Sequence, residues 1–234
     1  MVLYFVRHGE TLGNVGGLLD YSMSGKLTPK GVQQAEALVR RLDGVRIDEV
    51  IVSPLERTVM TALPYLKKTK MVAQGWPELA EIGGNKNVPQ ELPKQMRYGP
   101  ALELPEAARD YVKLDTSAPA CLPPDRELYV EGMRRCELAA NRIIERYAGK
   151  DITVLMVGHG CQGVRVLEAL LRIEMLGRFQ HDNVGMTLMR QKPNGEFIVL
   201  YMNRLPDPAN GASSSGPLPP ECCGVTGSNS RAAG

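Results

Sequence analysis

The chain has 234 residues, of which 43% are hydrophobic and 23% charged, and its formal net charge at pH 7 is +2. Such a chain can bury the core of one globular domain of generous size. A charge so close to balance excludes a general electrostatic attraction to nucleic acid or to a membrane surface, so neither is expected as a partner.

Cysteine usage and hydropathy predict the compartment. The five cysteines are odd in number and lack the spacing of metal ligands, so free thiols in a reducing environment are expected. The apolar run at residues 2–6 is too short for a secretory signal, and no other stretch is long enough to span a bilayer. A cytoplasmic location is therefore expected.

The first part of the chain alternates predicted strands with predicted helices. Residues 2–6 form a continuous apolar run, typical of a strand buried on both faces. Thr28 can cap a helix that starts with Pro29, because apolar residues then recur at helical spacing. Residues 50–52 predict a second buried strand. Residues 53–56 read as a capping box with proline at the first helical position, so a helix is expected to start there.

The rest of the chain is less regular at first. A short third strand is expected at 71–73, and then, from about 82 to 127, periodicity fades and prolines recur. This composition predicts an irregular, lid-like insertion with one helical turn or two. The elements expected after it are a helix at about 128–147, a strand at 152–157, a helix at about 162–172 and a hairpin formed by 186–190 and 197–202.

The end of the chain has a different composition. Beyond Leu205 it is mostly Pro, Gly, Ser and Ala. Such a segment buries too little apolar surface to offset its ordering entropy, so a disordered tail is expected over 205–234, after one domain at 1–204. Cys222 and Cys223 in this tail are only weak evidence for acylation.

Strands that alternate with helices predict an α/β fold, with three α/β/α layers around a mostly parallel central sheet. In such a sheet, ligands bind beyond the carboxyl ends of the strands. The residues that directly follow each strand are therefore candidates for one shared crevice.

Residues suited to phosphoryl transfer stand at these strand ends. Arg7 and His8 follow the first strand, Arg57 lies on the helix after the second, and His159 follows the last strong strand. A neutral imidazole is a competent nucleophile, and guanidinium groups can grip phosphoryl oxygens and stabilise the charge of the transition state. Helix amino-termini after residues 53 and 160 are expected to point backbone N–H groups at an anion.

Five motifs occur in order along the chain. Residues 7–11 read Arg-His-Gly-Glu-Thr, with Asn14 three residues on, and the second motif is Leu27-Thr28 with Gly31. The other three are Ser-Pro-Leu-x-Arg-Thr at 53–58, Leu-x-Glu-Ile at 79–82 and Val-Gly-His-Gly at 157–160. Together they resemble the motifs of the histidine phosphatase superfamily, the phosphoglycerate mutase-like branch 1.

The resemblance implies a phosphoglycerate mutase-like fold and a role for each matching residue. His8 would be the phosphorylated nucleophile, and Glu81 would donate a proton to the leaving group. His159 would assist as a catalytic residue and also join the phosphate pocket, whose other members would be Arg7, Asn14, Arg57 and Gly160. The family requires neither a metal ion nor another cofactor, so none is expected.

Several other residues are given ordinary interpretations. His181 is expected on the surface or in a loop, and Cys161 is expected to be a small buried thiol at a helix start. Glu78 is a near neighbour of Glu81 and competes with it for the role of acid. Two interpretations are open for Lys86, Lys94 and Arg97 in the insertion: they could bind a second acidic group on a substrate, or they could be the charges that a solvated loop carries anyway.

Three functions remain open at this point. The first is a phosphatase that acts on a small phosphorylated metabolite or a phosphoprotein. The second is a phosphoglycerate mutase, although the stretch typical of mutases after the general acid is replaced here, at 83–97, by a different sequence. The third is a binding protein on the same fold, which the intact set of site residues disfavours. The sequence leaves the oligomeric state and the substrate open.

Overall fold

The computed structural model describes residues 1–15, 25–83, 103–115, 117 and 127–206. The interpretations of Lys86, Lys94, Arg97 and the two tail cysteines concern residues outside these ranges. The predicted disorder of the tail likewise falls almost wholly outside them and stays a prediction.

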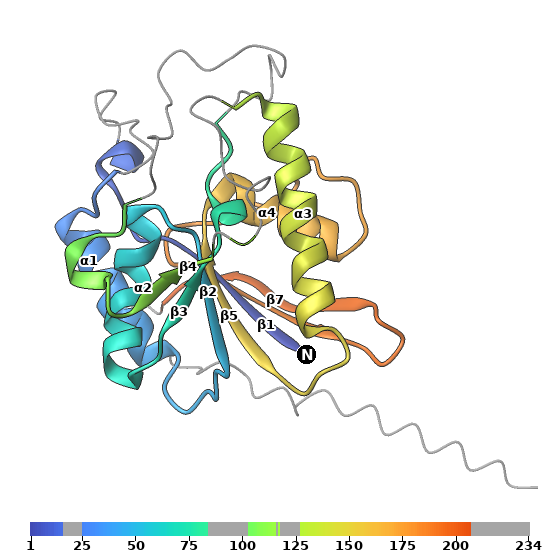
Figure 1. Cartoon of the computed structure of the whole chain (residues 1–234), viewed down its shortest axis with the longest axis horizontal. Helices are drawn as coiled ribbons and strands as arrows, with labels where there is room; N and C mark the ends of the chain where they lie inside the picture. The colour runs from blue at the N-terminus through green and yellow to red at the C-terminus, as the bar shows by residue number, and fades with distance from the viewer. Residues whose placement is uncertain (16–24, 84–102, 116, 118–126, 207–234) are drawn as a thin grey trace, which may run out of the picture.

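A seven-stranded, mostly parallel sheet forms the centre of the protein (Figure 1). Its strands are β1 (Val2–Arg7), β2 (Glu49–Val52), β3 (Ala73–Gly75), β4 (Val112–Leu114), β5 (Thr153–Gly158), β6 (Met186–Gln191) and β7 (Phe197–Arg204). The spatial order is β4-β3-β2-β5-β1-β6-β7. Neighbours from β4 to β1 pair in parallel, whereas β6 is antiparallel to both β1 and β7.

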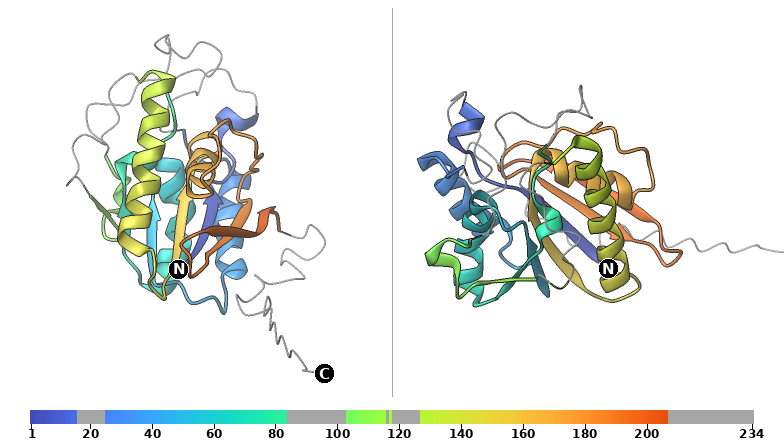
Figure 2. Two further views of the ribbon diagram at one scale, coloured as in Figure 1. Left: turned by 90° about the vertical axis from the view of Figure 1, so that its right-hand side faces the viewer. Right: turned by 45° about the horizontal axis from the view of Figure 1, so that its top comes forward.

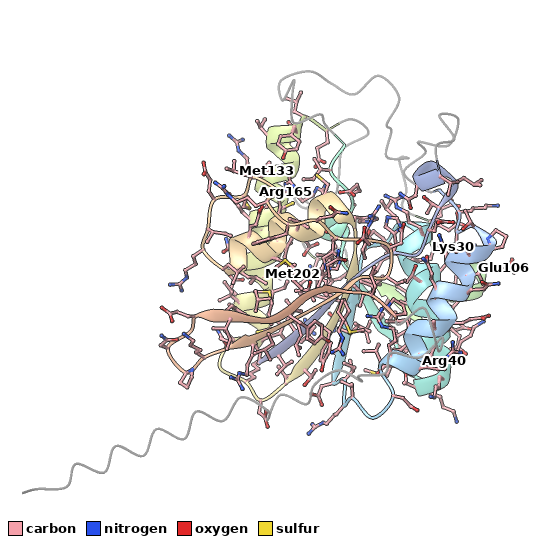
Figure 3. All side chains as sticks on the ribbon, turned by 180° about the vertical axis from the view of Figure 1, so that it is seen from behind. Lys30, Arg40, Glu106, Met133, Arg165 and Met202 are labelled. Carbon is pink, nitrogen blue, oxygen red and sulfur yellow. The ribbon has the colours of Figure 1, made fainter. Side chains whose placement is uncertain are left out.

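Helices cover both faces of the sheet, which confirms the three-layer α/β prediction. The helices are α1 (Pro29–Arg41), α2 (Glu56–Thr69), α3 (Tyr129–Tyr147) and α4 (Gly160–Leu170), joined by the short 3-10 turns η1 (Leu12–Val15), η2 (Pro77–Leu79) and η3 (Glu106–Ala108). The pair α1 and α2 lies on one face, and α3 and α4 lie on the other (Figures 1 and 2). Figure 3 shows the same division from behind, with Lys30 and Arg40 on α1 and with Met133 and Arg165 on α3 and α4.

Alternation along the strands divides the core between these two faces. Tyr4 and Val6 of β1 pack with side chains of α1 and α2, whereas Leu3 and Phe5 pack with side chains of α3 and α4. Side chains of a strand point alternately to opposite faces, so a continuous apolar run serves both cores. This is why β1 carries no polar residue before Arg7, apart from the hydroxyl of Tyr4.

A topological switch point lies at the carboxyl ends of β1 and β5, which are neighbours in the sheet. The chain leaves β1 for α1 on one face and leaves β5 for α4 on the other. Helices that depart to opposite faces leave a gap above the sheet edge between them, which is where ligands bind in open α/β sheets.

Local signals place α1 as predicted. Thr28 is its N-cap, and the Thr28 hydroxyl accepts a hydrogen bond from the backbone N–H of Gly31 at 3.0 Å. Pro29 occupies the first turn, where its missing N–H costs nothing. The predicted long helix, the following strand and helix, and the terminal hairpin are likewise confirmed as α3, β5, α4 and the β6–β7 pair.

The structure corrects two expectations around the insertion. The third strand lies at 73–75 rather than 71–73, and the region expected to be irregular supplies its parallel neighbour β4. The backbone N–H of Ala73 donates to the carbonyl of Tyr111 at 2.8 Å, so pairing across the sheet decides where β3 begins. A strand of three residues has too few positions to show a period, which is why β4 escaped prediction.

Candidate active site

The strand register brings His8 and His159 together. Arg7 pairs with Gly158 across the parallel strands β1 and β5, so the next residue of each strand is a histidine. The two imidazole rings lie 5.3 Å apart between centroids and are tilted by 60°. Both side chains are buried, His8 with 4% and His159 with 0% of its surface exposed.

The surroundings of His8 determine its protonation. Its Nδ1 lies 2.7 Å from the carbonyl oxygen of Gly9. A carbonyl can only accept, so Nδ1 carries the hydrogen and donates it. Burial lowers the pKa of His8 well below its ordinary value, and the charges of Arg57 and Arg7 lower it further against this hydrogen bond. The neutral ring therefore keeps a bare lone pair on Nε2.

The loop that carries His8 is held tightly against the start of α1. The carbonyl of Glu10 accepts the backbone N–H of Thr28 at 2.9 Å. A Cβ placed on Gly31 would lie 2.1 Å from that same carbonyl oxygen, so only glycine fits there. The Glu10 carboxylate also accepts hydrogen bonds from the Thr28 hydroxyl at 2.9 Å and from Lys30 at 2.7 Å.

Arg57 lies beside both histidines. It stands in the first turn of α2 and is buried. Its positive charge lowers the pKa of His8 and, after burial, is the largest cause of the lowered pKa of His159. Thr61, one turn on, donates to the carbonyl of Arg57 at 2.6 Å and accepts the backbone N–H of Gly9 at 2.9 Å. Thr61 thus ties the arginine helix to the histidine loop.

Ser53 corrects the predicted capping box. α2 begins at Glu56, and its N-cap is Leu55, which makes no side-chain cap. The Ser53 hydroxyl instead lies 2.8 Å from Nε2 of His159. Ser53 lies two residues before the N-cap, so its oxygen is beside the histidine rather than over the helix start. Ser53 is a site residue that the sequence interpretation assigned to capping alone.

Arg7 is oriented by the loop before β6. Its Nη1 donates to the carbonyl oxygen of His181 at 2.7 Å. His181 lies in a loop, as one of the two expectations had it, but its side chain is not at the surface. It is buried against Phe5, and its Nε2 lies 2.7 Å from the Thr187 hydroxyl. Burial and the charge of Arg7 lower the pKa of His181 to about 4.

A second residue of this loop, Asn183, reaches the predicted site. Its side-chain amide donates to the carbonyl of His8 at 3.0 Å and to Oδ1 of Asn14 at 3.1 Å. Asn14 is exposed, and its Oδ1 also accepts the backbone N–H of Thr11 at 3.0 Å. The signal that could have revealed Asn183 is topological: β6 runs antiparallel to β1, so its amino end meets the carboxyl end of β1.

The structure separates the two candidate acids. Glu78 is buried, and its carboxylate pairs with Arg142. Glu81 instead places Oε1 2.8 Å from the backbone N of Gln162 and Oε2 3.4 Å from that of Cys161, both in the first turn of α4. Burial lowers the pKa of Arg7, and the Glu81 charge acts against that shift, which places Glu81 near the arginine.

This arrangement also corrects an expectation about α4. Its first N–H groups are directed at the Glu81 carboxylate rather than into an open anion site. Gly160 matters here through its small size, because a Cβ on it would lie 3.2 Å from Nε of Arg7. Cys161 is half-buried rather than fully buried.

Within the ranges that the structure describes, no three His, Cys, Asp or Glu side chains are grouped as a metal ion would require. In the same ranges, no helix combines the length and the apolar character needed to cross a membrane.

Comparison with known proteins identifies the family. The sequence profile of the histidine phosphatase superfamily (branch 1) matches residues 3–204. A stretch of 82 residues is 40% identical to the adenosylcobalamin/alpha-ribazole phosphatase of Escherichia coli (strain K12); it covers 35% of this chain and only 40% of that relative.

Solved structures share the fold. The alpha-ribazole phosphatase from Shigella flexneri superposes with a TM-score of 0.63 at 24% identity, over 87% of this chain and 96% of the other. A mycobacterial glucosyl-3-phosphoglycerate phosphatase superposes with a TM-score of 0.60 at 20% identity, over 87% and 99%. With a profile that spans nearly the whole described fold, the chain belongs to branch 1 of the histidine phosphatase superfamily.

Proposed function

We propose that the protein is a phosphatase that hydrolyses phosphomonoesters through a phosphohistidine on His8. The observation that carries this proposal is the state of His8: a buried, neutral imidazole whose Nδ1 is bound to a carbonyl and whose Nε2 is bare, beside Arg57 and His159. A nitrogen nucleophile surrounded by cationic groups suits attack on a phosphoryl group, whose oxygens carry negative charge.

The reaction would proceed in two steps. Nε2 of His8 forms a bond to phosphorus while the bond from phosphorus to the ester oxygen breaks, and Glu81 donates a proton to the departing oxygen. Water then attacks phosphorus and passes a proton to the Glu81 carboxylate. The bond between nitrogen and phosphorus breaks, so that phosphate is released and both side chains return to their starting state.

The phosphate pocket would consist of Arg7, Arg57, Asn14 and His159, with Gly160 leaving room for Arg7. The His159 ring has a nitrogen available for a ligand, because its Nδ1 is buried and makes no hydrogen bond among the described residues. If the Ser53 hydroxyl donates to Nε2, Nδ1 carries the hydrogen and can donate it to a phosphoryl oxygen. A neutral histidine then adds a hydrogen bond without requiring a proton from solvent.

The proposed substrate is a small phosphorylated metabolite or a phosphoprotein. The named relatives support the metabolite, since they are phosphatases of alpha-ribazole and of glucosyl-3-phosphoglycerate. We further propose that the reaction needs no metal ion, because Arg7 and Arg57 can supply the positive charge that a metal would otherwise provide.

The test is phosphate release from a panel of sugar phosphates, phosphoglycerates, nucleotides and phosphopeptides, with EDTA present and His8→Ala as the control. We expect release that EDTA leaves unchanged and that disappears in the variant. Equal release by His8→Ala would contradict the proposal. No release from any ester, together with exchange of phosphate between phosphoglycerate positions, would instead indicate a mutase.

A further inference from the structure

A buried ion pair lies behind the segment that carries Glu81. Arg135 of α3 and Glu127, just before that helix, have 5% and 1% of their side chains exposed. They meet through two hydrogen bonds, from Nε to Oε1 and from Nη2 to Oε2, each 2.7 Å long. This bidentate geometry fixes both side chains in direction as well as distance.

Arg135 also holds the backbone on either side of the glutamate. Its Nη1 donates to the carbonyls of Glu78 at 2.9 Å and Ala80 at 2.6 Å, and its Nη2 donates to the carbonyl of Glu81 itself at 3.1 Å. A single guanidinium thus gathers three carbonyl oxygens of one short loop. No other described side chain binds this loop in that way.

Glu127 binds the same loop on the carboxyl side of Glu81. Its Oε2 accepts the backbone N–H of Gly83 at 3.1 Å, two residues after Glu81. Gly132 on α3 makes room, since a Cβ there would lie 2.9 Å from that same oxygen and 2.6 Å from Ile82. The pair therefore holds the loop before, at and after Glu81.

We propose that Arg135 and Glu127 are positioning residues that aim the Glu81 carboxyl group at the leaving oxygen of the substrate. This inference rests on the proposed function, in which Glu81 is the proton donor. Glu81 contacts the first turn of α4 through its carboxylate, whereas its backbone depends on α3 through Arg135. A shift of about 1 Å in a reacting group can cost about 100-fold in rate, so loss of the pair should act through Glu81.

Two substrates with different leaving groups can distinguish a role of the ion pair in positioning Glu81 from a general loss of protein stability. An alkyl phosphate such as glycerol phosphate releases a strongly basic alkoxide and needs the proton. p-Nitrophenyl phosphate releases a much weaker base and does not. A misplaced Glu81 should therefore slow the first ester far more than the second, while a partly unfolded enzyme would slow both equally.

The experiment compares kcat/KM on these two esters for wild type, Glu81→Gln, Arg135→Lys and Glu127→Gln. Both conservative variants keep a polar group in the buried site, and circular dichroism checks their folding. Glu168→Gln is the matched control. Like Glu127, Glu168 is buried and its carboxylate accepts backbone hydrogen bonds, here from Gly177 and Arg178, which are remote from Glu81 in the chain.

We expect Glu81→Gln to lose about 100-fold or more on the alkyl ester and little on p-nitrophenyl phosphate. Arg135→Lys and Glu127→Gln should lose about 10-fold or more on the alkyl ester only, and neither should add to the loss when combined with Glu81→Gln. Glu168→Gln should change both esters alike.

Two results would overturn different claims. Equal losses on both esters in Arg135→Lys and Glu127→Gln, with Glu81→Gln still selective, would show that the pair only stabilises the fold. A Glu81→Gln variant without any selectivity would remove the proton donor itself from the proposed function.

Discussion

The hydroxyl of Ser53 lies 2.8 Å from Nε2 of His159, and both side chains are fully buried. The backbone N–H of Leu55 approaches the same serine oxygen at 3.4 Å, so the hydroxyl hydrogen is available to the histidine. This contact decides which nitrogen of His159 carries hydrogen, and it comes from the residue that follows the neighbouring strand β2.

Ser53→Ala should therefore weaken catalysis. Removing one partner of a buried hydrogen bond costs about 1–3 kcal/mol, which corresponds to about a 5- to 150-fold lower kcat/KM if the loss falls on the transition state. Steady-state kinetics on p-nitrophenyl phosphate measure it. Ser117→Ala, which removes an exposed hydroxyl that donates to Asp115, is the control and should retain activity. An unchanged rate in Ser53→Ala would show that Nδ1 of His159 has no part in binding phosphate.

The pH profile should reveal a nucleophile that resists protonation. Burial, Arg57 and Arg7 lower the pKa of His8 well below its ordinary value of 6.5. The rate of phosphoryl transfer from p-nitrophenyl phosphate, which needs no proton donor, should thus stay level as pH falls through that value. A stopped-flow burst recorded over the acid range measures it. A burst rate that halves near the ordinary histidine value would contradict the assigned state of His8.

Stability should fall in acid for the same physical reason. The pKa of His181 is lowered from 6.5 to about 4, so between these values the unfolded chain binds a proton that the folded chain does not. The full free energy of unfolding is therefore present above the pKa that histidine has in the unfolded chain. It decreases as pH falls toward the pKa of the folded state, by about 1.4 kcal/mol per pH unit for each such histidine. His8 and His159 act in the same direction.

Urea unfolding at a series of pH values between neutral and mildly acidic checks this slope. His181→Gln removes one titrating group, so its slope should be smaller by about one proton even though its stability at neutral pH is lower. Identical slopes in wild type and variant would mean that His181 titrates alike in both states.

Gly31→Ala tests the close approach between α1 and the histidine loop. Helix propensity alone favours alanine by about 1 kcal/mol. The added Cβ would lie 2.1 Å from the Glu10 carbonyl oxygen, and backbone cannot move aside as a side chain tip can. We expect the clash to win, with a net loss of about 1–3 kcal/mol and a large loss of activity as the His8 loop shifts.

The control for this prediction is Gln33→Ala, an exposed position on the same helix, which should retain both stability and rate. Thermal unfolding and kcat/KM are the two measurements. A more stable and fully active Gly31→Ala would show that the loop is not held as described.

The sequence predicted the parts of the fold that depend on periodic burial. Residues 2–6 and 154–157 are continuous apolar runs, and the sheet pairs them side by side, in line with two cores that share each strand. An element that depends on a distant partner was missed. β4 pairs with β3 through Ala73 and Val112 at one end and Gly75 and Leu114 at the other, and no local pattern encodes that pairing.

The candidate site shows the same division. Arg7, His8 and His159 lie at the carboxyl ends of strands, and Arg57 lies in the first turn of the helix that follows β2. The topology brings them to one edge of the sheet, and their roles stay predictions. The local sequence around Ser53 matches a capping box, so its hydroxyl was assigned to a helix cap. In the structure the same hydroxyl instead contacts His159, a residue distant in the chain. Arg135 had no signal at all, since a charged residue on a helix with one apolar face is normally assigned to solvent.

The most direct test of the account is to trap the phosphoenzyme. Enzyme mixed with radiolabelled p-nitrophenyl phosphate is quenched in alkali within milliseconds, digested and mapped by mass spectrometry. We predict one phosphorylated peptide that carries the label on His8, that is lost in acid, and that is absent from His8→Ala. Label on another residue, or full turnover with no labelled protein at any time, would contradict the phosphohistidine mechanism.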